Sequence, residues 1–314
     1  MTSHHALIEN RIAAWAQALP PGNLYAPMRY LMGLPGKRIR PALTLMACEL
    51  FGGRAEDALD EALGIEVFHN FTLMHDDIMD DSPTRRGQPT VHVKWNIATA
   101  ILSGDAMLVQ AHQLMARDPR IAALFAMYAL RVCEGQQLDM DNERRTVVKL
   151  AEYQEMIRLK TAVLLSCALQ VGAMKAGATD AQCALIGRFG EELGLAFQVK
   201  DDLLDAFGDP AITGKQRGGD LRAGKRTSLL IRALEWSDAH GDGTLRHELS
   251  RPAQERDVDA ILAVIERSGA RQATEEAFNA HHAEAMKALA AVDVPDARKH
   301  ALRALATALL ERRA

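Results

Sequence analysis

Four aspartates lie in six consecutive positions of the segment HDDIMDDSPTRRG, residues 75–87, and two adjacent arginines follow them. Like charges one helical turn apart destabilise a helix by roughly 0.2–0.5 kcal/mol per pair, so the segment needs a compensating ligand. Asp76 and Asp80 are four residues apart and therefore project from one side of a helix, about 6 Å from each other. That spacing lets hard cations bridge the two carboxylates and keep open positions for phosphate oxygens. The segment predicts a site for divalent cations and a polyanion.

A second acidic segment, FQVKDDLLD at residues 197–205, repeats this spacing with Asp201, Asp202 and Asp205. Both segments follow long apolar stretches, IEVFHNFTLM and ELGLAFQV, which belong in a protein interior. One such motif alone is most often a solvated helix end. Two motifs at the ends of buried helices are costly unless cations compensate their charge. We therefore expect the two clusters to face each other across a cavity that holds several Mg²⁺ ions and a diphosphate.

Basic residues near the first motif could neutralise the remaining phosphate charge. Arg85 and Arg86 follow that motif directly, and the segment GKRIRP at residues 36–41 adds three cations after a glycine that can supply an unusual turn. Guanidinium groups hold diphosphate oxygens through paired hydrogen bonds. The cations of the GKRIRP segment are Lys37, Arg38 and Arg40.

Three further features have both a functional and a structural interpretation. His69 lies seven residues before Asp76 on almost the same helix face, so it is either a ligand or a hydrogen-bonded core residue. Lys160, in EMIRLKTAVLL, precedes an apolar run and is either a phosphate ligand or a snorkelling lysine. The segment GDPAITGKQRGGDLRAGKRTS has the composition of a lid, and its Lys215 and Lys225 are either ligands or ordinary surface residues.

The elements that position these residues must be helices. Of the 314 residues, 48% are apolar and only 5% aromatic, and the abundance of Ala, Leu and Met favours helix over strand. Apolar residues recur at spacings of three and four, and no stretch alternates convincingly enough for a strand. We therefore predict one all-α domain over residues 1–314, with a central bundle. The predicted helices are 40–51, 56–80, 96–116, 119–141, 149–177, 180–207, 227–238, 254–269, 272–291 and 296–312.

The predicted helix 180–207 is largely apolar and contains Gly187, Gly190 and Gly194. Glycines inside a buried helix indicate that a neighbouring element approaches its backbone closely.

Composition and charge also limit the functional class of the protein and its cellular compartment. A net charge of -4 gives no reason to expect nucleic-acid binding through bulk electrostatics. The N-terminal residues MTSHHALIENR lack a secretory pattern, and no run reaches the ~18 apolar residues needed to span a membrane. We expect a cytoplasmic protein whose scattered cysteines, without a CxxC pair, are buried thiols in a reducing compartment. These cysteines are Cys48, Cys133, Cys167 and Cys183.

Taken together, GKRIRP, HDDIMDDSPTRRG, LKTAVLL, FQVKDDLLD and TGKQRGGDLRAGK resemble the motifs of the trans-prenyl diphosphate synthases. This is the family of farnesyl and geranylgeranyl diphosphate synthases, and the similarity extends from about residue 20 to the C-terminus. The combined motifs are highly specific. Two departures are a proline, Pro35, where a glycine is common, and one residue inserted between Lys215 and Lys225.

The resemblance implies a fold and an activity. The fold is an all-helical bundle around a deep central cavity, of the isoprenoid synthase type, usually in a homodimer. The activity is the condensation of isopentenyl diphosphate with an allylic diphosphate (dimethylallyl, geranyl or farnesyl) by Mg²⁺-assisted ionisation.

The resemblance also implies residue roles. Three Mg²⁺ ions would be held by Asp76 and Asp80 on one side and by Asp201 on the other. Asp77, Asp202 and Asp205 would act through hydrogen bonds and metal-bound waters, and Asp205 is counted with the metal-binding set. The allylic diphosphate would be held by Arg85, Lys160, Gln198, Lys215 and Lys225. Isopentenyl diphosphate would be held by Lys37, Arg40, His69 and Arg86.

Other positions match the family less closely or lie at the edge of the site. Thr161 and the main-chain carbonyl before it would lie near the developing cation. Gln136 and Asp139, in GQQLDM, fit the pattern more loosely. Arg312 and Arg313 resemble a basic tail that closes over the site.

Product length is expected to depend on what blocks the apolar cavity below the first motif. Thr72, four residues before Asp76, is small, whereas Phe71 and Phe68 are bulky. In the family, bulk at the fifth position before the motif restricts the product to short chains. Together with the lack of an insertion in the motif, this favours geranylgeranyl diphosphate (C20) over farnesyl diphosphate (C15).

Two other classes of protein are weighed against this interpretation. His75-Asp76 also suggests a metal phosphohydrolase of the HD type, but that class leaves the second DDxxD and the arginine pair unexplained. A non-catalytic partner subunit of a prenyl synthase is the other alternative, and the complete set of motif aspartates argues against it.

The two aspartate motifs generate a first prediction. Replacing Asp76 or Asp201 with alanine should lower turnover by orders of magnitude, because each change removes a carboxylate expected to bind metal. Steady-state turnover with an allylic starter measures the effect, and circular dichroism checks that the helical content is kept. Wild-type turnover in either variant would refute the metal assignment.

Overall fold

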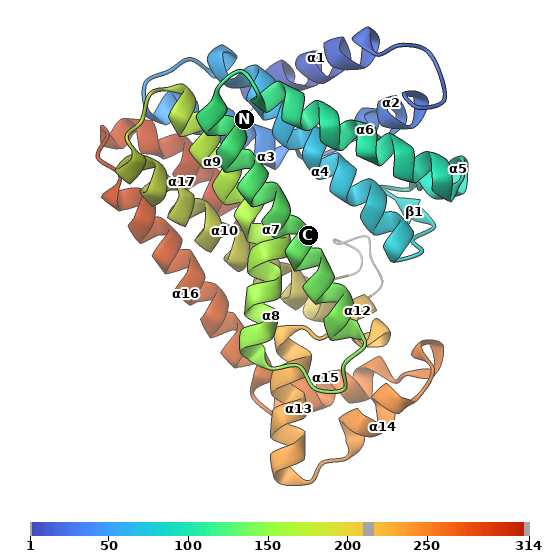
Figure 1. The fold of residues 1–314 in the computed structure, drawn as a ribbon. Coiled ribbons are helices and arrows are strands. Elements are labelled where there is room, and N and C mark those ends of the chain that lie inside the picture. Colours follow the sequence, from blue (N-terminus) through green and yellow to red (C-terminus); the bar gives the residue numbers. More distant parts are fainter. Residues whose placement is uncertain (1, 210–216, 311–314) are drawn as a thin grey trace. The chain divides into compact units, whose positions relative to one another are not determined.

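The structure, a computed structural model, describes residues 2–209 and 217–310 (Figure 1). Over these ranges the regular structure is helical except for one short antiparallel hairpin, β1 Thr84–Arg85 and β2 Gln88–Pro89. The predicted all-α class is confirmed. The chain forms two compact units, so the prediction of one domain around a central cavity stays a prediction. Unit 1 contains Met1–Tyr128, Cys167–Ile186 and Val294–Arg298, and unit 2 contains Ala129–Ser166, Gly187–Asp293 and Lys299–Ala314.

The helices fall into three groups by unit. Those of unit 1 are α1 Thr2–Ala18, α2 Ala26–Gly33, α3 Ile39–Leu50, the 3₁₀ turn η1 Ala55–Ala58, α4 Leu59–Met79, α5 Val91–Lys94 and α6 Ile97–Met115. Those with residues in both units are α7 Pro119–Glu143, α9 Val163–Lys175, α10 Asp180–Phe207 and α17 Asp296–Leu310. Those of unit 2 are α8 Leu150–Ile157, the π-helical turn η2 Arg158–Ala162, α12 Gly219–Ala223, α13 Ser228–His240, α14 Thr244–Ser250, η3 Ala253–Glu255, α15 Val258–Arg267 and α16 Ala270–Ala291.

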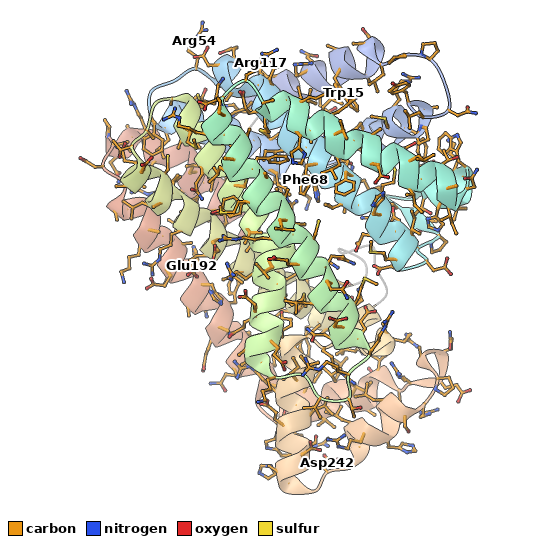
Figure 2. All side chains as sticks on the ribbon, in the orientation of Figure 1. Trp15, Arg54, Phe68, Arg117, Glu192 and Asp242 are labelled. Atoms are coloured by element: carbon orange, nitrogen blue, oxygen red, sulfur yellow. The ribbon has the colours of Figure 1, made fainter. Side chains whose placement is uncertain are left out.

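Unit 1 is organised around α4, which packs most extensively against α6 (Figure 1). Small residues let the two backbones approach, since a Cβ added at Gly64 would lie 2.8 Å from the Met115 side chain. On the buried face of α4, the Phe68 ring meets Phe125 edge-on with centroids 5.2 Å apart. Trp15 of α1, labelled with Phe68 in Figure 2, donates a hydrogen bond from Nε1 to Gln110 on α6. These contacts hold the helix whose end carries the first aspartate motif.

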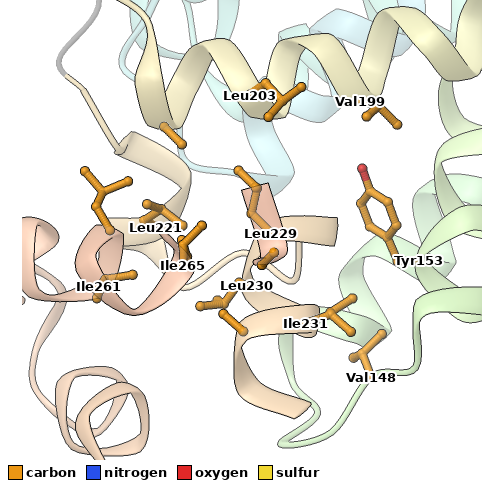
Figure 3. Packing of buried hydrophobic residues seen from close by; sticks show 14 of the residues in the cluster. Val148, Tyr153, Val199, Leu203, Leu221, Leu229, Leu230, Ile231, Ile261 and Ile265 are labelled. Carbon is orange, nitrogen blue, oxygen red and sulfur yellow. The ribbon is translucent and has the colours of Figure 1, made fainter. Parts of the chain in front are cut away.

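Unit 2 has its own apolar core, formed by α8, α10, α13 and α15 (Figure 3). Leu230, Ile261 and Ile265 are completely buried in it. Tyr153 of α8 belongs to the same cluster and points its hydroxyl toward the helix that carries Val199 and Leu203. A hydroxyl at the edge of an apolar cluster needs a partner, and α10 supplies one in the second aspartate motif.

A π-helical turn interrupts the run from α8 to α9. Within η2 the Val163 amide donates to the Arg158 carbonyl, five residues back. Two glycines make room for it: a Cβ at Gly135 of α7 would lie 2.2 Å from the Lys160 nitrogen, and one at Gly194 of α10 would lie 2.5 Å from the Cα of Ala162. The prediction of a close approach is thereby confirmed for Gly194. Such turns are frequent at functional sites.

Several sequence-based expectations are wrong in detail. Helix α1, which has 17 residues but weak apolar periodicity, and the short helices α2, α5, α12 and α14 were not predicted. The hairpin was not predicted either, because two-residue strands carry no alternation. Cys133 is exposed rather than buried, unlike the other three cysteines.

One helical stretch bears on the expectation that no apolar run is long enough to span a membrane. By length and composition, the helical stretch Leu150–Lys175 qualifies as a candidate span. However, 78% of its most apolar window is buried inside the protein, which is typical of a core helix.

The close packing of α9 against α3 predicts that one methyl group added at Gly172 destabilises the protein. A Cβ at Gly172 would lie 2.0 Å from the Thr44 carbonyl oxygen, so one of the two backbones must move. Gly172→Ala should therefore lower the free energy of unfolding by roughly 1–3 kcal/mol, the usual cost of overpacking a core. Denaturant unfolding measures this.

The matched control is Gly33→Ala in α2, where a Cβ would meet nothing within 4 Å. That control should be neutral or slightly stabilising. Equal stability of the two variants would contradict the close approach at Gly172.

Candidate active site

The first aspartate motif closes α4. The helix ends at Met79, and Asp80 caps it. Asp77 is almost completely buried, with 1% of its surface exposed, whereas Asp76 is half-buried and Asp80 exposed. Since positions i and i+4 share a face and i+1 lies about 100° around the helix, the middle carboxylate turns inward and the outer two do not.

The hairpin after α4 supplies the partner of the buried carboxylate. Arg86 and Gly87 form its turn with φ of 53° and 74°, the pair of positive values that a tight hairpin requires. This turn directs Arg85 back to the motif, where its Nε donates to both carboxylate oxygens of Asp77 at 2.9 Å. Burial raises the pKa of Asp77, and the Arg85 guanidinium opposes that shift. Arg85 therefore anchors the motif and also lies 3.9 Å from the Asp76 carboxylate.

Arg38 positions the GKRIRP segment. It adopts a left-handed backbone (φ 46°) at the N-terminus of α3 and is buried, with 4% exposed. Its guanidinium donates to Glu66 of α4 and Glu9 of α1 at 2.8 Å each, and to the carbonyls of Met32 and Leu34. Burial works against its charge, but Glu66 and Glu9 outweigh burial and hold the pKa of Arg38 above its ordinary value. The Arg38 guanidinium is thus fully engaged in contacts that hold the segment to α1 and α4.

Arg40, His69 and Arg86 come together beside this anchor. Arg40 Nη1 donates to His69 Nε2 at 3.1 Å, and Arg86 donates to the Leu34 carbonyl at 3.4 Å. Burial, opposed only by Glu66, lowers the pKa of Arg40 to about 10. Burial and then the Arg40 charge lower the pKa of His69 well below its usual value, so His69 is neutral near pH 7. The group is a cationic cluster in which a neutral histidine accepts from one arginine.

Among the other expected residues of unit 1, Lys37 is exposed in the same segment. Phe71 is buried, and its ring lies 5.5 Å from that of Phe68 and 4.8 Å from that of His75. Thr72 donates its hydroxyl to the His69 carbonyl.

His75 does not join the aspartates. Its Nε2 contacts the Ile101 carbonyl at 3.2 Å, and the ring fills the space above Gly104 of α6. The imidazole is therefore engaged with α6, which removes the histidine on which the HD-type alternative rests.

In unit 2, a chain of hydrogen bonds ends at the second aspartate motif. Thr161 donates to Gln198 at 3.2 Å, and Gln198 donates to Asp202 Oδ1 at 3.1 Å. The Tyr153 hydroxyl donates to the other oxygen of Asp202 at 2.5 Å. Burial, opposed by these two donors, raises the pKa of Asp202 to about 7.

The second motif thus repeats the arrangement of the first. Asp202 is only 4% exposed, whereas Asp201 and Asp205 are half-buried. Asp205 accepts a hydrogen bond from the Asp220 amide at 2.9 Å, which joins the end of α10 to the start of α12.

Lys160 is placed by the π-helical turn. Its ammonium lies 2.6 Å from Asp139 of α7. The turn is only possible beside Gly135 and Gly194, because any larger residue would strike its backbone. The Lys160 ammonium is thus ion-paired with Asp139, and both side chains are half-buried.

One pocket of unit 2 collects many of the expected residues. It encloses about 600 Å³ of empty space, part of it open to solvent. Its lining from the expected set is Asp139, Lys160, Thr161, Gln198, Asp202 and Lys225. The pocket is therefore lined by three cations, four carboxylates and neutral donors, a composition that suits a phosphate ester and a metal together.

The pocket also contains residues that sequence reasoning missed. They include Asn142, Tyr153, Asp220 and Arg226. Tyr153 lies seven residues before Lys160, a spacing that could have suggested a shared helix face. Asn142 lies near the end of α7, Asp220 lies in the short helix α12, and Arg226 lies in the connection between α12 and α13, and no local pattern predicts that these positions meet.

Some expected residues are not tested. Lys215, Arg312 and Arg313 lie outside the described residues. Within the described ranges, no three His, Cys, Asp or Glu side chains form a group ready to hold a metal.

Comparison with known proteins gives the class of this chain. A family model for polyprenyl synthetases matches residues 21–265. The geranylgeranyl diphosphate synthase of Methanosarcina mazei is 42% identical over 233 residues, which are 71% of this chain and 72% of that protein. A crystal structure of a geranylgeranyl pyrophosphate synthase is similar over 100% of this chain and 99% of that one, with 40% identity and a TM-score of 0.93.

A third similar protein was solved with ligands. It is the geranylgeranyl pyrophosphate synthase of Corynebacterium glutamicum, described as complexed with isoprenyl diphosphate and magnesium. It is 30% identical, covers 98% of each chain and has a TM-score of 0.87.

The chain belongs to the polyprenyl synthetase family. It is a prenyltransferase, a short-chain trans-prenyl diphosphate synthase, and the isoprenoid synthase fold expected from the motifs is confirmed. Enzymes of this family use isopentenyl diphosphate and an allylic diphosphate, and are generally dependent on Mg²⁺. The alternatives of an HD-type phosphohydrolase and of a non-catalytic subunit are wrong.

The hydrogen-bond chain in unit 2 predicts a role for Tyr153. Tyr153→Phe removes a donor to the buried Asp202 side chain, and a buried acceptor left without its partner costs about 1–3 kcal/mol. We expect lower stability and, because Asp202 then holds Gln198 less firmly, a fall in kcat of about tenfold with a smaller change in KM. Thermal unfolding and steady-state kinetics measure the two effects.

The matched control is Tyr128→Phe, which removes a buried hydroxyl hydrogen-bonded to Gln170 in unit 1. The control should lose stability but keep its kcat. If both variants keep wild-type kcat, Tyr153 has only a structural role.

Proposed function

We propose that this enzyme makes geranylgeranyl diphosphate (C20), with farnesyl diphosphate (C15) as a second product. The observation that carries the proposal is the shared pocket of Lys160, Thr161, Gln198 and Lys225. The family resemblance assigns Lys160, Gln198 and Lys225 to the allylic diphosphate and places Thr161 near the developing cation. The C20 length is supported by similarity to geranylgeranyl diphosphate synthases.

The allylic diphosphate would occupy this pocket. Lys160 and Lys225 would contact its phosphate oxygens as point charges, and the Gln198 amide would orient it. Thr161, hydrogen-bonded to Gln198, would place its hydroxyl next to the carbon that becomes cationic. Arg85 and Lys215 are assigned to the same diphosphate from their motifs alone.

Isopentenyl diphosphate would bind the cationic cluster of unit 1. Arg40 and Arg86 offer forked donors, and Lys37 adds a charge from the exposed edge. Neutral His69 can donate to phosphate while it accepts from Arg40, since an imidazole has one donor and one acceptor nitrogen. Arg38 would keep the segment in place.

The aspartate motifs fit magnesium. Each offers two outer carboxylates one turn apart, and the buried Asp77 and Asp202 are held by protein donors. Two carboxylates do not complete an octahedral shell, which suits an ion that keeps waters and takes the rest of its ligands from substrate phosphates. Asp76, Asp80, Asp201 and Asp205 would hold three such ions with the substrate. Bound magnesium would neutralise the charge that develops on the departing diphosphate.

The reaction then needs no nucleophilic side chain. Departure of the diphosphate leaves an allylic cation, which fixed cations such as Lys160 favour by stabilising the leaving charge. The alkene of isopentenyl diphosphate attacks this cation and forms a carbon–carbon bond. A proton is lost from the product, and the released diphosphate is the nearest base. The residues of the pocket would also exclude water, which would trap the cation as an alcohol.

We also propose a homodimer that works in the cytoplasm. An apolar face on α5 and α6 supports the dimer, because a second copy would bury side chains that are otherwise exposed. These side chains are Val93, Ile97, Ile101, Leu102 and Val109.

Product chromatography tests the proposed function. With Mg²⁺, isopentenyl diphosphate and geranyl or farnesyl diphosphate, the enzyme should release diphosphate and accumulate the C20 product. Removal of the metal with a chelator should abolish turnover. A product longer than C20, or a mixture dominated by C15 from every starter, would contradict the proposed length.

Phe71 is the proposed floor for the growing chain. Phe71→Ala should extend the products beyond C20, because the smaller side chain opens space next to Phe68 and His75. Its control is Phe125→Leu, which alters the same aromatic cluster from α7. An unchanged product distribution in Phe71→Ala would remove Phe71 as the floor.

A further inference from the structure

A second pocket of unit 2 has an arginine-rich wall that the proposed function does not use. It is an open pocket with about 660 Å³ of empty space, between the loop after α7 and the helices α13 and α14. Four of the nine residues that line it are arginines: Arg144, Arg145, Arg226 and Arg246. The one carboxylate among the lining residues is Glu143.

The ion pairs around the pocket do not use up its donors. Arg145 makes a bidentate pair with Glu152, and Arg246 makes one with Asp238. A guanidinium has five N–H donors and a bidentate carboxylate takes two, so both arginines keep donors for another acceptor. Four arginines against Glu143, Glu152 and Asp238 leave one positive charge on the wall.

The unpaired donors of Arg226 give the strongest argument that this pocket binds an anion. Its Nη2 donates to the Arg145 carbonyl at 3.3 Å, but its Nε and Nη1 are buried without a hydrogen-bond partner among the described residues. Buried donors of a charged group are costly to leave unpaired. Burial, and then the charges of Arg256 and Arg246, lower the pKa of Arg226, so a nearby anion would relieve an unfavourable field.

We propose that this pocket binds a phosphate-type oxyanion, inorganic phosphate or diphosphate, at a site that adjoins the candidate active-site pocket. Forked guanidinium donors and residual positive charge are the features that recognise such an ion. Thr146 and Ser250 add hydroxyl donors to the same wall. Arg226 and Glu143 line both pockets, so an ion bound here neighbours the residues assigned to the allylic diphosphate.

The test is calorimetric titration of the full chain with phosphate and, separately, with diphosphate. Potassium chloride at matched ionic strength controls for screening. The pocket variant is Arg144→Ala combined with Arg246→Ala, since these residues line only this pocket. The complementary variant is Lys160→Ala, which lines only the candidate active-site pocket. The matched control is Arg251→Ala, a neighbouring arginine paired with Glu248 but outside the lining.

The expected result is a class of phosphate sites whose Kd rises about tenfold or more in the pocket variant and is unchanged in Lys160→Ala and in Arg251→Ala. The ion that binds more tightly, phosphate or diphosphate, identifies the occupant. If the pocket variant binds both ions as the wild type does, or if Lys160→Ala alone abolishes all binding, the proposal is overturned. Binding of phosphate does not depend on product formation, so this outcome is independent of the proposed function.

Discussion

A carboxylate removed from water must be met by donors, and this constraint organises both aspartate motifs. In each motif, the middle aspartate is buried in the protein and the two outer aspartates are not. Asp77 is held by Arg85, and Asp202 is held by Tyr153 and Gln198. The two solutions differ in charge: one is an ion pair, and the other relies on neutral donors with a pKa near 7 for the acid. In both, satisfying the buried acid fixes the helix end that presents the outer carboxylates.

The GKRIRP segment follows the same constraint, but here the buried group is a cation and its partners are carboxylates. Arg38 is the buried cation, and Glu66 and Glu9 compensate it from two different helices. That arrangement holds the segment on which Arg40 stands, beside the neutral His69. Cations that look interchangeable in the sequence GKRIRP therefore differ in the structure: Arg38 is held by protein carboxylates, whereas Lys37 is exposed. A substitution at Arg38 would act through three elements at once.

Much of the fold can be predicted from the sequence. Helix α10 was predicted with its observed bounds, and α4 ends within one residue of its predicted end, because long apolar stretches with helical period leave little choice. The hairpin could not be predicted in this way, since it depends on two positive φ angles rather than on a hydrophobic pattern. The π-helical turn could not be predicted from the local sequence either. It depends on Gly135 and Gly194, which are far from it in the sequence, making room for its backbone.

The sequence by itself determined the class of chemistry, because DDxxD spacing, arginine pairs and apolar helices are local features that need no partner to be recognised. Only the tertiary structure decided which charged and polar groups are paired inside the protein. It paired Lys160 with Asp139, turned His75 toward α6 and brought Tyr153 to Asp202. The physical reason is that burial and hydrogen-bond partners are set by residues distant along the chain, and these control the charge and orientation of each group.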